Sequence, residues 1–429
     1  MLPSSFRSKL SACADSLFSG LDAIAKATSL IERTSRRFSA KGFVLAVMNA
    51  TLNGKGSFND LAEALSVTEP ESLSSQAMSK RIDTCAVAFM LEVVTAAAAA
   101  RWNREDLIEV RDFNRVIMED SSQIALPAAN HPDFPGHGNG TSKTSGCKFD
   151  YAFDLVHEDV VHCELHLATT QDREIGKSVV DKLRANDLLI RDMGYFSLGE
   201  FALIEQRGAF WLSRLPLNVS ARDAAGRPLE ELLRKAKGEV VEFEALVGNV
   251  GHKARLVAVR ADRKTAEKRR RERREEARKH GKTPDQAALL RDGWHLMITN
   301  IGAGRMSIAG LFKLYGVRWQ IEIVFRAWKQ SSNHRAAFAR RSNSNHLQVL
   351  MLASMLRLIL TQKVASLLRA CHPDRWLSIE KIARHFASHL TGVKKLESFG
   401  DYEPDPRHIQ IGRRKGRKSL VESTFSILG

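Results

Sequence analysis

The chain has few of the features that mark secreted or membrane proteins. Its 429 residues include five cysteines, widely scattered and without a Cys-x-x-Cys pair. An odd and dispersed set fits a reducing compartment better than a disulfide framework or a zinc site. No apolar run reaches membrane-spanning length, because the best candidate, residues 349–360, is short and contains Arg357; it predicts a buried helix. The N-terminus lacks the apolar core of a signal peptide, so we expect a cytoplasmic protein.

Positive charge is abundant instead. The sequence carries 65 Lys and Arg residues against 49 Asp and Glu residues, a net charge of +16. Such an excess favours a polyanionic partner, which is either nucleic acid or an anionic membrane face. Nucleic acid is the preferred prediction, and no membrane is expected. The length allows two or three domains with a sizeable core, and no internal repeat is visible.

Residues 1–105 are predicted to be wholly helical and to form a DNA-binding domain. Ser57 and Asp60 resemble a capping box that opens one helix, and Ser74 or Ser75 is the expected start of the next helix, which runs on into an alanine-rich stretch. Two short helices around a turn are typical of a helix-turn-helix DNA reader, but a plain helical bundle gives the same pattern. The candidate DNA contacts are three polar side chains of the second helix: Gln76, Lys80 and Arg81.

Residues 106–345 are predicted to form an α/β domain. The first strand, residues 115–119, ends at Asp120, and the fourth strand ends at Asp192. Between and after them the pattern predicts strands at 148–156, 160–168 and 209–212 and a helix at 175–185. Loops at strand ends are where α/β folds place their chemistry, although an aspartate there is also a common turn starter.

Two further regions complete the predicted organisation. An insertion at about residues 215–300 contains β-like segments and a charged helix, and residues 260–279 hold eleven Lys and Arg against five Asp and Glu. That helix is either a solvated surface or an arm that grips phosphates. Residues 346–429 are predicted to form a C-terminal helical region with a basic tail at 413–418. The helices after His346 are the expected dimer interface.

Residues 314–330 read as one amphipathic helix with four polar residues in step: Tyr315, Arg318, Glu322 and Lys329. Their separations of three, four and seven residues put all four on one face of a helix with about 3.6 residues per turn. An ordinary surface with ion pairs at helical spacing would give the same pattern. The functional alternative is a metal-binding carboxylate set beside groups that hold phosphates.

The spacing Tyr-x2-Arg-x3-Glu-x6-Lys in this helix resembles the C-terminal motif of insertion-sequence transposases of the DDE superfamily. Upstream, IMEDSS at residues 117–122 looks like the first motif of that family, and LLIRDMGYFS at 188–197 looks like the second. The resemblance covers roughly residues 40–370 and is strongest to the insertion-sequence-four-like group. It implies a ribonuclease-H-like catalytic domain in which Asp120, Asp192 and Glu322 are the catalytic, metal-binding triad.

The resemblance implies cut-and-paste transposition. Two Mg²⁺ ions, or Mn²⁺ in their place, would assist attack by water on the DNA strand, and the freed 3′-OH would then attack in turn. Tyr315, Arg318 and Lys329 would hold DNA phosphates beside the scissile bond. Trp294, in the insertion, is a candidate platform for stacking an extruded base, or else a core residue of its strand.

The same resemblance implies partners and a location. The partners are double-stranded DNA, as transposon ends with terminal inverted repeats and as target, and a second copy of the chain in a homodimer. The location is the bacterial cytoplasm, on the nucleoid when DNA is bound. The main alternative is a catalytically decayed transposase that acts only as a DNA-binding protein or repressor, but the presence of all three carboxylates favours the enzyme. For a tyrosine or serine recombinase, the sequence offers no supporting arrangement.

Overall fold

The computed structural model describes residues 4–33, 35–103, 112–138, 143–338, 343–373 and 375–411, so the basic tail at 413–418 lies outside the described residues. The described residues form two compact units. The first unit takes those of Met1–Glu109, Asp120–Thr170 and Trp319–Lys418, and the second takes those of Val110–Glu119 and Gln171–Arg318. This division differs from the predicted domains at 1–105, 106–345 and 346–429, which stay a prediction.

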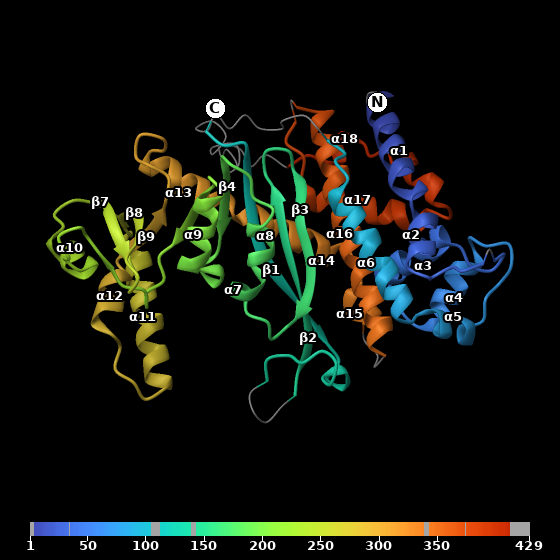
Figure 1. Ribbon diagram of the computed structural model, residues 1–429, viewed down its shortest axis with the longest axis horizontal. Coiled ribbons are helices and arrows are strands. Elements are labelled where there is room, and N and C mark those ends of the chain that lie inside the picture. Colours follow the sequence, from blue (N-terminus) through green and yellow to red (C-terminus); the bar gives the residue numbers. More distant parts are fainter. Residues whose placement is uncertain are drawn as a thin grey trace. The chain divides into compact units, whose positions relative to one another are not determined.

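Every element that the structure describes before residue 100 is a helix (Figure 1): α1 (Ser4–Ser19), α2 (Leu21–Ala27), α3 (Ala40–Asn53), α4 (Phe58–Ser66), α5 (Ser75–Arg81) and α6 (Thr84–Ala99). The predicted capping box opens α4, because the Asp60 amide donates to the Ser57 hydroxyl at 3.2 Å and the Ser57 amide donates to the Asp60 carboxylate at 3.0 Å. Ser74 caps α5 in the same way, accepting from the amide of Ala77 at 3.2 Å.

The predicted run of α5 into the alanine-rich stretch is wrong. Helix α5 ends at Arg81, and α6 begins after Asp83 with a bend of 69° between the two helices. The bend has a local cause. The Asp83 carboxylate accepts hydrogen bonds from the amides of Cys85 and Ala86, so it caps a new helix instead of continuing the old one.

Helix α16 (Ser344–Ala370) lies at the core of the first unit, packed against α3, α6 and β3. It is long and apolar enough to cross a membrane, but its apolar window is fully buried inside the protein. This confirms the buried helix predicted around Arg357. The unit also contains α14 (Trp319–Gln330), α15 (His334–Ala337), α17 (Ile379–Gly392), α18 (Pro406–Ile409) and the 3-10 turns η1 (Ala128–Asn130) and η3 (Leu396–Asp401).

In the described part of the chain, nine strands form one sheet in the order β3-β2-β1-β4-β5-β9-β8-β7-β6. Their bounds are β1 (Arg115–Leu126), β2 (Ser145–Asp154), β3 (Asp159–Leu167), β4 (Asp187–Arg191), β5 (Phe210–Arg214), β6 (Ala221–Arg222), β7 (Val240–Val247), β8 (His252–Arg260) and β9 (Trp294–Thr299). Strands β1, β4 and β5 pair in parallel, and β2 and β3 pair antiparallel. The mixed α/β class predicted from the sequence is therefore confirmed.

Strand β1 does not end at Asp120, as predicted, but continues to Leu126. Pairing between β1 and β4 does stop there, since the last pair in their register is Glu119 with Arg191. The reason is the unequal length of the neighbours of β1. Strand β4 has five residues, whereas β2, on the other side of β1, has ten.

The second unit holds seven helices among its described residues: α7 (Asp172–Ile175), α8 (Lys177–Val180), α9 (Leu198–Gln206), α10 (Leu229–Lys235), α11 (Arg263–Lys279), α12 (Gln286–Arg291) and α13 (Ile308–Val317). The 3-10 turn η2 (Met193–Tyr195) follows β4. The helix predicted at 175–185 is thus two four-residue helices, α7 and α8. Gly176 lies between them, and its carbonyl accepts a hydrogen bond from the buried side chain of Arg191.

The predicted insertion extends the sheet. Its last strand, β9, returns to pair antiparallel with β5, with Leu212 opposite Thr299. Strands β8, β7 and β6 follow outward from β9, all antiparallel. Within this unit, the insertion is therefore hydrogen-bonded into the same sheet as β4 and β5.

Candidate active site

Asp120 and Asp192 each follow the last residue pair of the β1–β4 ladder, which is Glu119 with Arg191. Both aspartates are partly exposed, whereas the preceding Glu119 and Arg191 are buried. The carboxylate of Asp120 accepts from the amide of Ser121 at 2.8 Å. Parallel strands end at a common edge, which is the expected position for chemistry in an α/β fold.

The residues that immediately precede the two aspartates, Glu119 and Arg191, belong to a buried ion network. The guanidinium of Arg191, 3% exposed, donates to the carboxylate of Glu119 at 2.5 Å, to that of Glu200 on α9, and to the carbonyl of Gly176. Burial alone would lower the pKa of Arg191, but the two carboxylates outweigh burial and raise it. Sequence reasoning missed this network. Its signal was a charged residue, Glu119 or Arg191, at the end of each apolar run and immediately before each aspartate.

Tyr315 on α13 hydrogen-bonds to Asp192. Its hydroxyl donates to the Asp192 carboxylate at 3.4 Å, a long contact. Burial, and then the neighbouring Asp192 carboxylate, raises the pKa of Tyr315 to about 12. The phenol therefore keeps its proton at neutral pH and remains a donor toward Asp192.

The single helix predicted for residues 314–330 is wrong. Helix α13 ends at Val317 and α14 begins at Trp319. Arg318 between them keeps a right-handed helical backbone, with φ −48° and ψ −30°, but its amide bonds to the carbonyl of Tyr315, three residues back, at 3.1 Å. A three-residue turn is tighter than an α-helical turn, so it interrupts the helix at this position.

Glu322 and Lys329 lie on α14, in the first unit. Glu322 is partly exposed in the first turn of the helix. The ammonium of Lys329 donates to the carbonyl of Gln123, on β1, at 2.9 Å, and partial desolvation lowers its pKa. Glu322 thus lies on a helix whose far end is tied to the strand that contains Asp120.

Helix α14 is anchored on α16 through buried polar contacts. The indole of Trp328 donates to the carbonyl of Ser354 at 3.0 Å. In return, Arg357 donates to the carbonyl of Trp328 at 3.1 Å and to the hydroxyl of Ser331 at 3.0 Å. Arg357 is 1% exposed and has no carboxylate partner among the described residues, so burial lowers its pKa to about 9.

The predicted carboxylates are suitable ligands for a hard cation such as Mg²⁺, which takes oxygen ligands and few protein carboxylates. Asp120 and Glu322 belong to the first unit and Asp192 to the second. In the part of the chain that the structure describes, no three His, Cys, Asp or Glu side chains are arranged to hold a metal ion. The chemistry of this donor set therefore fits the implied ion.

Trp294 opens β9 and is 3% exposed. The guanidinium of Arg260 covers its ring, 4.4 Å from the centroid, and Arg269 donates to its carbonyl at 3.2 Å. Its environment is that of a core tryptophan. A DNA base could stack on the ring only after Arg260 had moved away.

The three predicted DNA contacts on α5 differ in exposure. Gln76 and Lys80 are exposed, whereas Arg81 is half-buried with its guanidinium 4.6 Å from the ring centroid of Phe38. Met78, between them, is fully buried and fixes the inner face of α5. Gln76 and Lys80 therefore remain accessible to a ligand, while Arg81 also serves packing.

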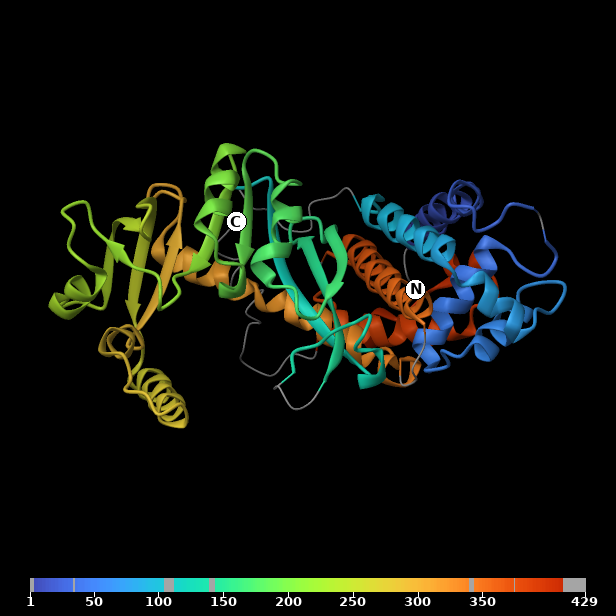
Figure 2. The same cartoon turned by 60° about the horizontal axis from the view of Figure 1, so that its bottom comes forward.

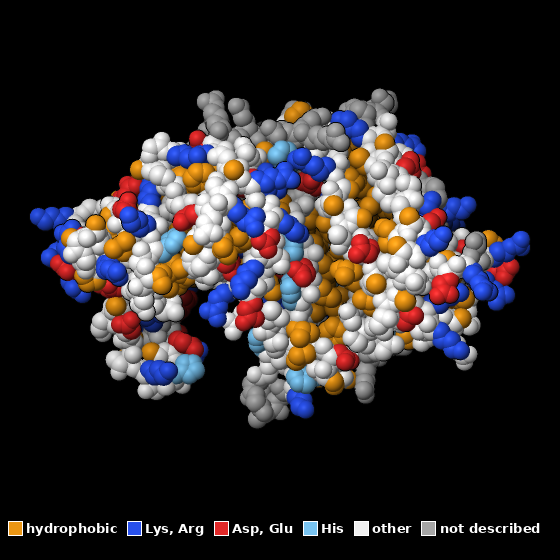
Figure 3. Space-filling view, in the orientation of Figure 1, with side chains coloured by type: hydrophobic (Ala, Val, Ile, Leu, Met, Phe, Trp, Pro, Cys, Tyr) orange, Lys and Arg blue, Asp and Glu red, His pale blue; other side chains and the backbone are white. Residues whose placement is uncertain are grey.

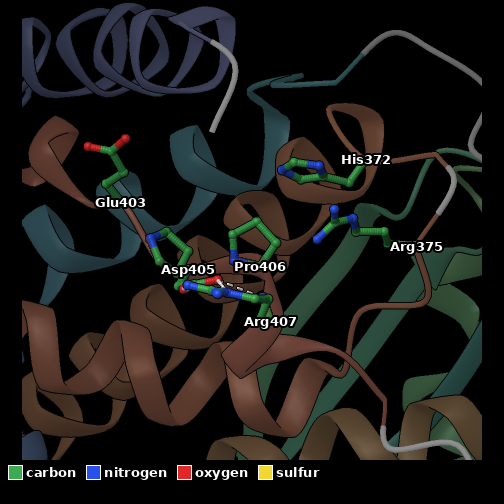
Figure 4. A pocket seen from close by; sticks show the side chains of 7 residues that line it. His372, Arg375, Glu403, Asp405, Pro406 and Arg407 are labelled. Carbon is green, nitrogen blue, oxygen red and sulfur yellow. Dashed lines mark hydrogen bonds and ion pairs between the residues drawn. The ribbon is translucent and has the colours of Figure 1, made fainter. Parts of the chain in front are cut away.

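A polar pocket of 540 Å³ lies beside α18, in the first unit (Figure 4), lined by His372, Arg375, Glu403, Pro404, Asp405, Pro406 and Arg407. Arg407 forms an ion pair with Asp405 at 2.6 Å. The two arginines are matched by two carboxylates, so the pocket offers no excess charge for an anion.

Comparison with known proteins agrees with these motifs. Residues 111–358, more than half of the chain, match the family described as Transposase DDE domain. The chain is 26% identical over 336 residues to the transposase of insertion sequence element IS231B from Bacillus thuringiensis subsp. berliner, covering 72% of this chain and 70% of that protein. It is 25% identical over 334 residues to the transposase of IS1151 from Clostridium perfringens, with the same coverage.

Among solved structures, the piggyBac transposase synaptic complex with hairpin DNA is similar, with a TM-score of 0.46 and 11% identity over 97% of this chain and 84% of that one. The family match and the sequence relatives define the class of the protein. The chain belongs to the DDE superfamily of insertion-sequence transposases.

Proposed function

We propose that this protein is a cut-and-paste DNA transposase that hydrolyses a phosphodiester bond at each transposon end and joins the freed 3′-OH to target DNA. The observation that carries the proposal is the position of the three carboxylates. All lie within the family match at 111–358, and Asp120 and Asp192 each follow the last pair of the parallel β1–β4 ladder. In this proposal, the catalytic domain is ribonuclease-H-like.

Asp120, Asp192 and Glu322 would hold two Mg²⁺ ions. Bound there, the ions would supply activation of the attacking oxygen and stabilisation of the leaving oxygen. The Tyr315 hydroxyl, protonated at neutral pH, orients Asp192 by donating to it. In the hydrolytic step an oxygen of water forms a bond to phosphorus, the bond from phosphorus to the 3′ oxygen breaks, and that oxygen takes up a proton.

Phosphate positioning falls to the cations near the carboxylates. Arg318, at the junction of α13 and α14, can hold a phosphate with two parallel hydrogen bonds. Lys329 acts as a point charge, and it would exchange its backbone partner, the carbonyl of Gln123, for a DNA phosphate.

DNA recognition and assembly complete the proposal. Gln76 and Lys80, exposed on α5, are candidates for contacts with the terminal inverted repeat, together with Arg81. Because two transposon ends must be joined, we propose that the active form is a homodimer on DNA, in the bacterial cytoplasm. The net charge of +16 supports a DNA partner.

Cleavage of a cognate end tests the proposal. A duplex ending in the inverted repeat that flanks the reading frame should be nicked at its 3′ end in the presence of Mg²⁺ or Mn²⁺. Asp120→Asn, Asp192→Asn and Glu322→Gln should each abolish nicking and leave DNA binding in a gel shift largely intact. Wild-type rates in any of the three variants would remove that residue from the site.

The non-enzymatic alternative gives a different result in the same assay. A DNA-binding protein or repressor would shift the cognate duplex, but neither Mg²⁺ nor Mn²⁺ would produce a nick with the wild-type protein. The three carboxylate variants would then be indistinguishable from wild type in every readout.

A further inference from the structure

Helix α11 in the insertion divides its charges between two sides. Lys264, Glu267, Arg271, Arg274 and Arg278 are separated by three, four, three and four residues, so they share one side of the helix. All five are exposed. Four of the five are cations, and we call this set the basic stripe. The neighbouring side carries the remaining acidic residues of the helix, Glu272, Glu275 and Glu276, with Lys268 and Lys279.

The inner face of α11 is fixed to the second unit. Ala266 is buried, and Arg270 donates to the carbonyl of Leu289 at 3.0 Å. Arg273 forms an ion pair with Asp292 at 2.6 Å. Figure 2 shows the helix running away from strands β7, β8 and β9, with its C-terminal part standing clear of them. The stripe is thus presented on an anchored element rather than on a loop.

The charges of the stripe are not neutralised within the helix. Among the described residues, Lys264, Arg274 and Arg278 have no acidic partner, whereas Arg271 pairs with Glu275 at 4.0 Å. Lys268 and Lys279, on the neighbouring side, have partners in Glu272 at 3.9 Å and Glu276 at 3.6 Å. In the view of Figure 3, basic and acidic side chains lie close together at the end of α11. The exposed cations of α11 that lack an acidic partner among the described residues, Lys264, Arg274 and Arg278, nevertheless share one side of the helix.

We propose that the basic stripe of α11 binds the phosphate backbone of double-stranded DNA outside the cleaved bond. The inference rests on the proposed function, since it assigns to this helix a part of the DNA contact. From Lys264 to Arg278 the helix rises about 21 Å, which matches about six base-pair steps of 3.4 Å. Four cations along that length provide non-specific grip, because phosphate contacts carry no sequence information.

The test compares two double variants that remove equal charge from the same helix. Arg274→Gln with Arg278→Gln removes two positive charges from the stripe, and Lys268→Gln with Lys279→Gln removes two from the other side. Gln is a good helix former, so α11 should persist in both, as circular dichroism would verify. Binding to cognate and unrelated duplexes is measured by fluorescence anisotropy across a range of KCl concentrations.

The stripe variant should lose affinity for both duplexes alike. Removing two phosphate contacts should reduce the slope of log affinity against log salt concentration by about 1.8. At about 0.1 M salt, this corresponds to a loss of affinity on the order of tens of fold. The control variant should keep the wild-type slope. Equal losses in the two variants, or none in either, would overturn the proposal and leave a solvated helix.

A gain-of-affinity variant makes the result independent of folding. Glu267→Gln removes the acidic residue of the stripe and releases Arg263, its partner at 2.8 Å, so affinity should rise a few-fold. Glu272→Gln, on the other side, should change nothing. If the stripe variant instead loses binding to vesicles containing phosphatidylglycerol and keeps its affinity for DNA, the DNA assignment is wrong. If the wild-type protein binds no duplex at all, the proposed function is overturned together with the role of the stripe. If the protein binds DNA but does not cleave it, only the proposed function is contradicted, and the role of the stripe stands.

Discussion

Each unit contains a buried arginine, and the two side chains have different kinds of hydrogen-bond partner. Arg191 in the second unit is enclosed by two carboxylates and a carbonyl. Arg357 in the first unit has only carbonyl and hydroxyl oxygens, at the C-terminal end of α14. The pKa of Arg191 is raised, whereas that of Arg357 falls to about 9.

Because their partners differ, the two arginines should contribute differently to stability. Arg191 cross-links β1, β4 and α9 just before Asp120 and Asp192, and removing it would leave two buried carboxylates unpaired. Arg357 satisfies carbonyls at a helix end, where a cation is also favoured by the helix dipole. Its loss removes a costly buried charge together with useful hydrogen bonds, so the two effects partly cancel.

The largest effect is expected for Arg191→Met. Breaking a buried ion network from one side typically costs about 3–5 kcal/mol, because the remaining charges have no partner. Urea unfolding should show this loss. If the variant unfolds before purification, the triple change Arg191→Met, Glu119→Gln and Glu200→Gln should recover part of the stability. A loss below about 1 kcal/mol would mean that the network contributes little.

A buried histidine extends the comparison to a side chain that burial keeps neutral. His346 is 5% exposed and stacks on Phe58, with ring centroids 4.2 Å apart. Burial lowers its pKa to about 4. Between pH 6.5 and 4 the unfolded chain binds this proton and the folded chain does not, so stability should fall with pH across that window by up to about 3 kcal/mol.

The control for this pH effect is His346→Phe, which keeps a stacked ring and cannot titrate. Its stability should change less than that of wild type between pH 6.5 and 4, measured by urea unfolding at each pH. Parallel curves for the two proteins would show that other groups cause the acid sensitivity.

A smaller effect is expected for Arg357→Met. The variant leaves the carbonyl of Trp328 and the hydroxyl of Ser331 without this donor, which costs about 1–2 kcal/mol, but it also relieves the desolvation of the guanidinium. Urea unfolding beside Arg191→Met should rank Arg191→Met as clearly more damaging. The reverse order would show that the helix-end contacts stabilise more than the ion network.

The smallest effect is expected for Tyr315→Phe. The hydrogen bond to Asp192 is long, at 3.4 Å, and the ring keeps its half-buried packing. Nicking of a cognate end should slow by about two- to fivefold with unchanged DNA affinity, consistent with about 0.5–1 kcal/mol. A loss as large as that of Asp192→Asn would assign Tyr315 a direct part in the reaction.

Local signals predicted much of this structure from the sequence. The capping box of Ser57 and Asp60 can be recognised from four consecutive residues. The end of β4 before Asp192 can be predicted because an apolar run stops there at a turn. The same strand-end signal predicts Asp120 and Asp192 as site residues and the family motif adds Glu322, and these three roles stay predictions.

Features that depend on distant partners could not be predicted in this way. Residues 120–123 are polar and read as a turn, yet β1 continues through them because it has a long neighbour in β2. At Arg318 the helix is interrupted because the backbone amide bonds to the carbonyl three residues back, that of Tyr315. Such a change does not alter the periodicity of the side chains, so the sequence pattern does not reveal it. Glu119 and Arg191 are 72 positions apart in the sequence, and the register between β1 and β4 brings them together. Their pairing therefore cannot be predicted without that register.

The return of β9 to β5 has a mechanical consequence. Tension on α11 reaches β9 through the contacts of Arg269 with Trp294 and His295, and then passes across hydrogen-bonded ladders from β9 to β5 and β4. Strand β4 leads directly into Asp192. A load carried by the insertion would therefore pass through hydrogen-bonded backbone to the residue before Asp192, which is one of the proposed metal ligands. Excising the insertion would leave β5 with a bare edge prone to self-association.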